Sequence, residues 1–87
     1  EEAAARKSAV AERRALTREV EKLDKQLAGW QMEKARLDDQ LADPALYEDR
    51  GKLTASLKRQ AELTALIDPA ELRWLEIHEV LEAMSVE

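Results

Sequence analysis

The fold is decided by a stretch near the middle of the chain that reads Leu41-Ala42-Asp43-Pro44-Ala45-Leu46-Tyr47-Glu48-Asp49-Arg50-Gly51-Lys52-Leu53. Asp43 is a residue type that caps helix N-termini, and Pro44 suits the first position of a helical turn because its missing N–H would have no partner there. Gly51 weakens any helix that runs through it. The stretch therefore predicts a turn at which the chain reverses between two long helices.

Two large apolar side chains, Leu46 and Tyr47, lie inside this turn. We predict that both close the end of the helix pair against water, because their apolar surface has no other place to be buried. An alternative for Tyr47 is that its ring is presented to a nucleobase.

The residues before the turn show the spacing of a coiled coil. A mostly apolar series recurs in alternating steps of four and three, and its members are Ala9, Arg13, Leu16, Val20, Leu23, Leu27, Trp30, Lys34, Leu37 and Leu41. A step that averages about 3.5 residues keeps one seam against one partner helix. Gly29 is expected to make room for the Trp30 indole across that seam. We predict a first arm over residues 3–42.

The second helical pattern is less regular and covers residues 52–85. Its apolar face is predicted from Leu53, Leu57, Ala61, Leu63, Leu66, Ile67, Leu72, Trp74, Leu75, Ile77, Leu81 and Met84, with Gln60 and Thr64 on the same face. Asp68-Pro69 followed by Glu71 has the form of a capping box that starts a new helix. No spare residues supply the ~2–8-residue connection that a third helix needs, so we predict a kink near Asp68-Pro69 within one continuous arm.

These patterns predict an all-α fold in which residues 1–87 form one domain. The domain is an antiparallel two-helix coiled-coil hairpin with an arm over 3–42, a tip over 43–51 and an arm over 52–85. Residues whose numbers add up to about 93 are expected to face each other. This alignment puts Trp30 near Leu63 and Trp74 near Val20. Because the seam closes within one chain, we expect a monomer.

The composition excludes several classes of protein. The chain has 87 residues, 3% of them aromatic and 38% charged, with two glycines, no cysteine and one histidine, His78. It has no Gly-rich phosphate loop, no convergent metal ligands and no base near a serine nucleophile. We predict no catalytic residue, no metal site and no bound cofactor. The longest apolar runs fall short of the ~20 residues of a membrane span, so we expect a soluble, cytoplasmic protein.

The net charge of −5 is unevenly distributed. Residues 1–60 carry 13 basic and 12 acidic side chains, whereas residues 61–87 carry one basic and seven acidic side chains. A general nucleic-acid binder is not acidic overall, so only a local surface fits that role. A second basic group at the start of the first arm is expected to pair with the acidic stretch 71–87, and it comprises Arg6, Lys7, Arg13, Arg14 and Arg18.

The candidate surface lies at the tip, where basic groups of both arms come to one height. Such a cluster beside an aromatic ring suits a phosphate backbone. The predicted nucleic-acid-binding residues are Lys34, Arg36, Tyr47, Arg50, Lys52, Lys58 and Arg59. The alternative is an ordinary mixed-charge coiled-coil exterior, because acidic residues are interleaved at Asp38, Asp39, Asp43, Glu48, Asp49 and Glu62.

The stretch from Leu41 to Tyr47 resembles the tip motif in the C-terminal coiled-coil domain of ABC-F ATPases, the Uup-like group of tandem ATP-binding-cassette proteins. Three segments of the second arm add to the resemblance: Lys52-Leu53-Thr54-Ala55-Ser56-Leu57, Trp74-Leu75-Glu76 and Leu81-Glu82-Ala83-Met84. The similarity covers most of the chain. Asp68-Pro69 departs from the family pattern, in which this arm is usually uninterrupted.

The resemblance implies a non-catalytic domain appended to a cytoplasmic parent ATPase, whose two cassettes lie upstream of residue 1 and alone use ATP and magnesium. Members of that family act on ribosomes in translation, and the C-terminal domain of the Uup-like group is associated with DNA. Our hypothesis is a domain that binds DNA or ribosomal RNA through its basic tip. The alternative is a spacer or self-association coiled coil with no nucleic-acid role, whose seam pairs between chains.

Overall fold

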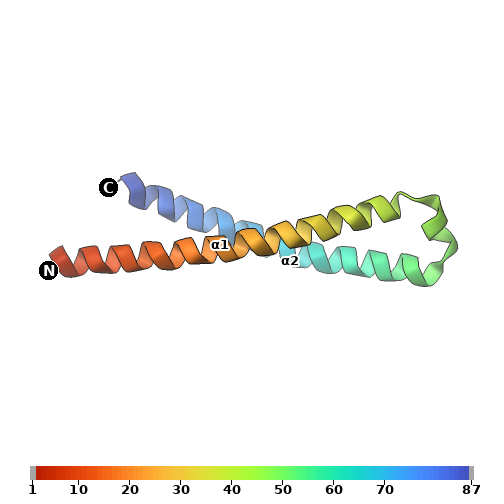
Figure 1. Ribbon diagram of the computed structural model, residues 1–87, viewed down its shortest axis with the longest axis horizontal. Helices are drawn as coiled ribbons and strands as arrows, with labels where there is room; N and C mark the ends of the chain where they lie inside the picture. The colour runs from red at the N-terminus through yellow and green to blue at the C-terminus, as the bar shows by residue number, and fades with distance from the viewer. Residues whose placement is uncertain (1, 87) are drawn as a thin grey trace.

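The computed structural model describes residues 2–86, which form a long helical hairpin (Figure 1). Helix α1 spans Glu2–Leu41, a short 3-10 helix η1 spans Pro44–Glu48, and helix α2 spans Arg50–Val86. The principal dimensions are 68 × 19 × 14 Å, so the molecule is a rod. The predicted all-α antiparallel hairpin is confirmed, and the described residues contain no strand.

Neither long helix could serve as a membrane span, because no window of the described residues is apolar enough over the necessary length.

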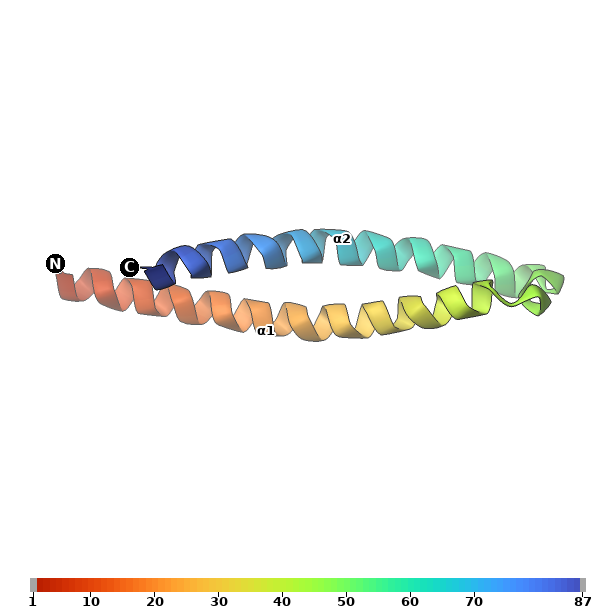
Figure 2. The ribbon, with the colours of Figure 1, turned by 90° about the horizontal axis from the view of Figure 1, so that it is seen from above.

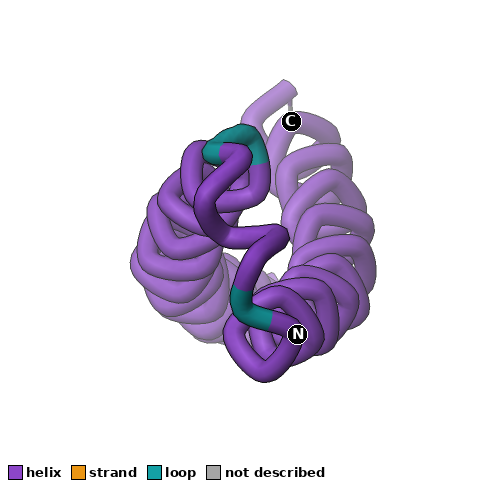
Figure 3. The backbone as a smooth tube through the Cα atoms, turned by 90° about the vertical axis from the view of Figure 1, so that its right-hand side faces the viewer, coloured by secondary structure: helices purple, strands orange, loops and turns teal. Residues whose placement is uncertain are grey.

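The turn is held by hydrogen bonds from its own side chains. The Asp43 carboxylate accepts the Ala45 N–H at 3.0 Å, and so caps η1 with Pro44 in the first turn. The Asp49 carboxylate accepts the Lys52 N–H at 3.1 Å and caps α2 in the same way. Figure 3, which looks at the tip, shows η1 crossing from one long helix to the other. Local capping therefore fixes the point of reversal.

The predicted seam of α1 is confirmed from Leu16 to Leu41. Val20 and Leu27 are buried, and the other members of the series in this range are half-buried, Lys34 among them. Leu27 forms one core cluster with Leu63, Ile67 and Ala70 of α2, and Trp30 packs against that cluster. Trp30 therefore lies against a cluster that includes Leu63 and also Ile67 and Ala70. Ala9 and Arg13 are exposed.

The seam of α2 is more regular than the sequence suggested. Its buried and half-buried residues step by three and four without interruption through Leu53, Ser56, Gln60, Leu63, Ile67, Ala70, Trp74, Ile77, Leu81 and Met84. Four leucines that we assigned to the apolar face are exposed instead, namely Leu57, Leu66, Leu72 and Leu75. That part of the prediction was wrong because the heptad geometry, and not side-chain hydrophobicity alone, decides which positions face the partner helix.

The alignment of the two arms differs from the predicted one by about one helical turn, or ~5.4 Å. Trp74 Nε1 donates a hydrogen bond to Asp24 Oδ1 at 2.7 Å, so Trp74 lies level with Asp24 and not with Val20. The reason lies at the tip. The first turn of α2 and η1 occupy the end of the rod together, so α2 begins beyond the end of α1 (Figure 1).

Helix α2 continues through Pro69 as one element, as predicted. Pro69 is exposed, and so is Ala65, whose carbonyl loses its helical N–H partner there. Water can therefore satisfy that carbonyl without any change in the seam. Both helices bow along their length (Figure 2), and they cross in the perpendicular view (Figure 1), as two helices that wind around each other do.

Gly29 does not make room for an indole, contrary to the expectation. It is exposed on α1, and a Cβ added to it would meet nothing within 4 Å. A glycine inside a helix costs roughly 0.5–1 kcal/mol relative to alanine. We predict that Gly29→Ala raises the free energy of unfolding by about that amount in urea denaturation. A lower stability of the variant would show that Gly29 meets an unrecognised steric requirement.

Leu63 and Leu72 offer a matched test of the seam, because both are leucines of α2. Leu63 is 0% exposed, whereas Leu72 is 60% exposed. We predict that Leu63→Ala lowers the free energy of unfolding by about 2–4 kcal/mol, and that Leu72→Ala changes it by less than about 0.5 kcal/mol. Thermal and urea unfolding followed by circular dichroism measure both values. Equal effects of the two substitutions would contradict the assigned seam.

Candidate nucleic-acid interface

One of the predicted tip cations, Arg59, is engaged within the rod. Its Nε and Nη2 donate to the two carboxylate oxygens of Glu33 on α1, at 2.6 and 2.9 Å, and its Nη1 lies 3.3 Å from Glu62 Oε2. Hydrogen bonding from the Arg59 guanidinium lowers the pKa of the Glu33 carboxyl. Arg59 therefore ties the two arms together, and its charge is balanced inside the protein.

The same arrangement recurs farther from the tip. Arg73 of α2 donates from Nε and Nη2 to Glu19 of α1, at 2.6 and 3.0 Å, and its Nη1 lies 3.4 Å from Glu76 Oε2. Hydrogen bonding from Arg73 lowers the pKa of Glu19. Neither inter-arm pair was predicted from the sequence. The available signal was that Glu19 and Glu33, and likewise Arg59 and Arg73, are two heptads apart.

The other predicted basic residues of the tip form no ion pair with any described residue. Arg50, Lys52 and Lys58 are exposed on the first turns of α2. On α1, Lys34 is half-buried at a seam position, and Arg36 is exposed with its Nη2 3.6 Å from the sulfur of Met32. The structure therefore brings five cations to this end of the rod without acidic partners among residues 2–86.

Three of the interleaved carboxylates at the tip accept hydrogen bonds from the protein itself. Asp43 and Asp49 accept the backbone N–H groups that cap η1 and α2. Asp38 Oδ1 accepts the side-chain amide of Gln60 at 2.8 Å, across the seam. These carboxylates serve the fold, and their directions are fixed by it.

Only half of the predicted plug at the tip is present. Leu46 is half-buried, whereas Tyr47 is 56% exposed. The Tyr47 hydroxyl donates to the Leu41 carbonyl at 2.9 Å, which satisfies one of the unpaired carbonyls at the end of α1. Tyr47 thus caps α1 with its hydroxyl and leaves much of its surface accessible at the tip.

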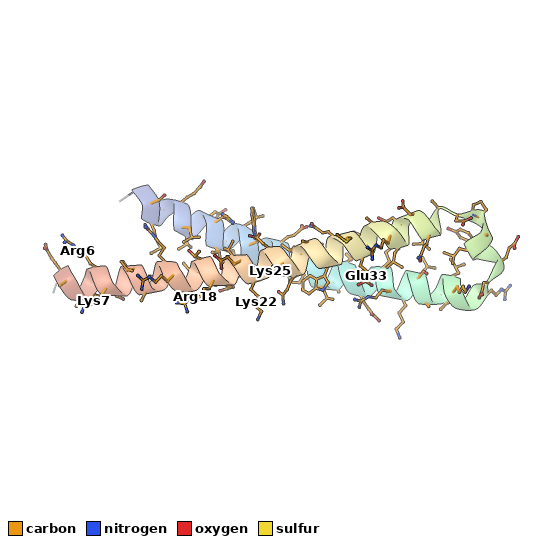
Figure 4. The ribbon with its side chains drawn as sticks, in the orientation of Figure 1. Arg6, Lys7, Arg18, Lys22, Lys25 and Glu33 are labelled. Carbon is orange, nitrogen blue, oxygen red and sulfur yellow. The ribbon has the colours of Figure 1, made fainter. Side chains whose placement is uncertain are left out.

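The expected internal pairing of the second basic group was wrong for four of its members. Within residues 2–86, no ion pair involves Arg6, Lys7, Arg14 or Arg18, and Arg13 Nη2 donates to the Met84 carbonyl at 3.1 Å. Two features explain the difference. Helix α1 extends past the described end of α2 (Figure 2), and Lys7 projects from the side of α1 away from α2 (Figure 4).

The middle of the rod contains an apolar groove between the arms, and no group of chemistry-bearing residues. Leu27, Ala28, Trp74 and Leu75 line the groove together with Asp24, Gln31 and Glu71, and Gln31 Nε2 donates to Glu71 Oε1 at 3.0 Å. The His78 ring packs on the Trp74 ring with centroids 3.9 Å apart, and its Nε2 is buried with no hydrogen-bond partner among the described residues. No cluster of His, Asp or Glu in residues 2–86 has the geometry of a metal site.

The inter-arm pairs predict a specific response to acid. Because the pKa of Glu33 is lower in the folded chain than its ordinary value of 4.5, the pair stabilises the fold above that pH and loses this effect as the pH falls through the lowered pKa. We predict that Glu33→Gln weakens the fall in melting temperature between about pH 5 and pH 3. Glu79→Gln, which removes an exposed carboxylate with no ion partner in residues 2–86, should keep the wild-type slope. Identical pH profiles for Glu33→Gln and the wild type would contradict the role of this pair.

Comparisons with known proteins assign the rod to a family. The family model of the ABC transporter C-terminal domain matches residues 11–79, which include most of both arms and the whole tip. Searches of curated proteins and of solved structures found no significant match. Such a domain is an accessory, non-catalytic region of an ABC protein, in agreement with a chain whose described residues form only a helical hairpin. The chain belongs to the ABC transporter C-terminal domain family.

Proposed function

We propose that this chain is the C-terminal accessory domain of a cytoplasmic ABC-F ATPase of the Uup-like group, and that it contacts DNA or ribosomal RNA through the hairpin tip. The family assignment supports an ABC parent. The Asp43-Pro44 tip motif and the Trp74-Leu75-Glu76 segment support the narrower group. The catalytic cassettes, with their ATP and magnesium, belong to the parent and not to these residues.

The single observation that carries the proposal is the imbalance of charge partners at the tip. Arg50, Lys52 and Lys58 have no ion partner among the described residues, whereas Asp43 and Asp49 accept backbone hydrogen bonds at the two caps. Unpaired cations on an exposed convex end are available to phosphate oxygens. The exposed ring surface of Tyr47 lies in the same region and can stack on an unpaired base.

The position of the tip is also suitable for contact at a distance. Both termini lie near the opposite end of a rod that is 68 Å long (Figure 1). A parent joined at the N-terminal side would therefore hold the tip far from its cassettes. A small end on a long stalk can enter a groove or a gap between helices of nucleic acid that the larger cassettes cannot reach.

The alternative, a self-association coiled coil, is less consistent with the packing. Leu63 and Ile77 are 0% exposed within a single chain, so pairing of the seam between chains would require the hairpin to open. A spacer role does not require the hairpin to open, but it does not explain why the cations of the tip lack ion partners.

Binding of duplex DNA and of ribosomal RNA to the 87-residue chain, followed by fluorescence anisotropy, tests the proposal. We expect affinity to fall with salt with a log–log slope of magnitude about 3–5, as four to six neutralised phosphates give. Neutralisation of Arg50, Lys52 and Lys58 to glutamine should reduce the magnitude of this slope by about 3. Tyr47→Phe, which keeps the ring and removes the hydroxyl that caps α1, serves as the control and should bind as the wild type does.

The outcomes separate the parts of the proposal. No salt-dependent binding of the wild type to either polymer would rule out a nucleic-acid role. Binding that is retained in the triple variant with an unchanged slope would place the contact elsewhere on the rod. Sedimentation velocity across concentration should give a monomer, and concentration-dependent dimerisation would favour self-association.

A further inference from the structure

The outward positions of α1 carry a second concentration of positive charge, far from the tip. In the heptad set by the seam, the positions that face away from α2 between Lys7 and Lys25 are all exposed. Five of them are cations, one is a carboxylate, Glu21, and the rest are Ala or Ser. The cations of this face, which we call the α1 basic face, are Lys7, Arg14, Arg18, Lys22 and Lys25.

Contacts with α2 engage two carboxylates that lie near these cations, although Lys22 still contributes, after Arg73, to the lowered pKa of Glu19. Glu19 lies in the same segment of α1 but binds Arg73 on α2. Asp24 lies between Lys22 and Lys25 but accepts the indole N–H of Trp74. Both acidic groups are therefore held on the side of α1 that contacts α2. Among residues 2–86, no ion pair involves any member of the α1 basic face.

The opposite side of the rod at this level has the reverse charge. The exposed residues of α2 there include Glu76, Glu79 and Glu82, and Arg73 is the one cation in this half of the described helix. The half of the rod away from the tip, which contains the start of α1 and the end of α2, thus has a basic side on α1 and an acidic side on α2. In Figure 4, Lys7 and Lys22 extend from the edge of α1 that lies away from α2.

The spacing of these cations disfavours a purely structural role. Arg14 and Arg18, and again Arg18 and Lys22, are four residues apart, so their side chains are neighbours on the helix surface. Like charges at this spacing destabilise a helix by roughly 0.2–0.5 kcal/mol per pair, whereas a carboxylate at either position would stabilise it. Glu21 lies three residues after Arg18 and four before Lys25, so it offsets part of the charge, but the row Arg14, Arg18 and Lys22 has no alternating charge along it. A polyanion that neutralises the row removes the repulsion.

We propose that the α1 basic face is a second nucleic-acid-binding surface, which lies along a phosphate backbone while the tip contacts the same polymer or a neighbouring segment. This proposal rests on the nucleic-acid role proposed for the domain. Lys7 to Lys25 covers ~27 Å of straight helix at ~1.5 Å per residue, a length over which duplex DNA carries about 16 charges. The face can therefore meet several phosphates at once.

The chemistry of the face also defines the kind of recognition. Between its cations it carries only Ala, Ser and Glu21, and no Asn or Gln that could read a base edge. Contacts from Lys and Arg to phosphates alone fix position without sequence preference. The acidic side on α2 is repelled by the same polymer, so it favours the orientation with α1 inward. The surface is therefore a sequence-independent, one-sided contact for a nucleic-acid backbone.

Two sets of neutralising substitutions test this surface apart from the tip, with a duplex of arbitrary sequence titrated against the 87-residue chain at several salt concentrations. The face variant contains Arg14→Gln, Arg18→Gln, Lys22→Gln and Lys25→Gln. We expect it to bind at least about tenfold more weakly at low salt, and to reduce the magnitude of the log–log slope by about 3–4. We expect a similar loss for a second duplex of unrelated sequence.

A net-charge control uses the other side of the rod. Glu76→Gln, Glu79→Gln and Glu82→Gln change the total charge by almost the same amount, in the opposite sense, without touching the α1 basic face. We expect this variant to keep the wild-type slope, because it adds no phosphate contact. All substituted side chains are exposed, so circular dichroism and unfolding midpoints should be close to those of the wild type.

The results distinguish this inference from the proposed function. If the tip triple variant loses slope and the face variant does not, the face is not an interface and the proposed function stands. If the face variant loses slope, the inference stands whether or not the tip contributes. If the wild-type chain binds no duplex but forms a dimer that the face variant abolishes, the face binds the acidic side of a second copy, and both proposals are wrong.

Discussion

The rest of the structure depends on the burial of one narrow seam between two helices. Only six hydrophobic residues are buried among those described, and two of them, Leu63 and Ile77, are fully inaccessible. A two-helix rod has no enclosed core that could compensate for a lost seam residue, since all the remaining described residues are at least partly exposed to water. Stability is therefore concentrated in a few layers, and most exterior positions can carry charge without affecting the packing.

Polar contacts across the seam determine which layers meet. Asp24 with Trp74 and Asp38 with Gln60 are the same contact two heptads apart, and so are the pairs of Glu19 with Arg73 and Glu33 with Arg59. The heptads between them carry apolar residues at the corresponding positions of α2. If α2 slipped by one heptad, Glu19 would face Leu66 or Val80 in place of Arg73. Asp24 would face Ile67 or Leu81 in place of Trp74. A slip in either direction leaves Glu19 and Asp24 beside apolar side chains, although one direction brings Lys52 opposite Glu33. The observed alignment is therefore favoured over its nearest competitors.

The sequence was sufficient for the hairpin and insufficient for its surface. Asp43-Pro44 and the alternating steps from Leu16 to Leu41 predict the turn and the first arm, because capping and heptad spacing act locally. In α2, exposed leucines such as Leu66 concealed part of a heptad that passes through Ser56, a small residue that packing against α1 selects. Gln60 was predicted on the correct face.

The charge partners were harder to predict, for a physical reason. Whether Arg59 is paired or available to a ligand depends on which α1 side chain its guanidinium reaches. The predicted alignment places Arg59 opposite Lys34, next to Glu33, and heptad spacing alone does not show which of the two it contacts. The exposure of the tip candidates Lys52 and Lys58 could be predicted from their position near the turn alone. The pairing of Arg59 needed the side-chain geometry of both arms. The extension of α1 past the described end of α2 (Figure 2) needed the length of the turn as well.

The overall acidity of the chain does not argue against a polyanionic partner once the charges are located. The net charge is −5, but the excess of acidic side chains lies in residues 61–87 of the sequence. The short dimensions of the rod are 19 and 14 Å, whereas charges are screened over about 8 Å at 0.15 M ionic strength. A phosphate at the α1 basic face therefore experiences the nearby cations much more strongly than the carboxylates of α2. At about 0.01 M salt the screening length exceeds the width of the rod, and only there does the net charge oppose the approach of a nucleic acid. For the proposed nucleic-acid contact, the local placement of charge by the heptad therefore matters more than the total charge.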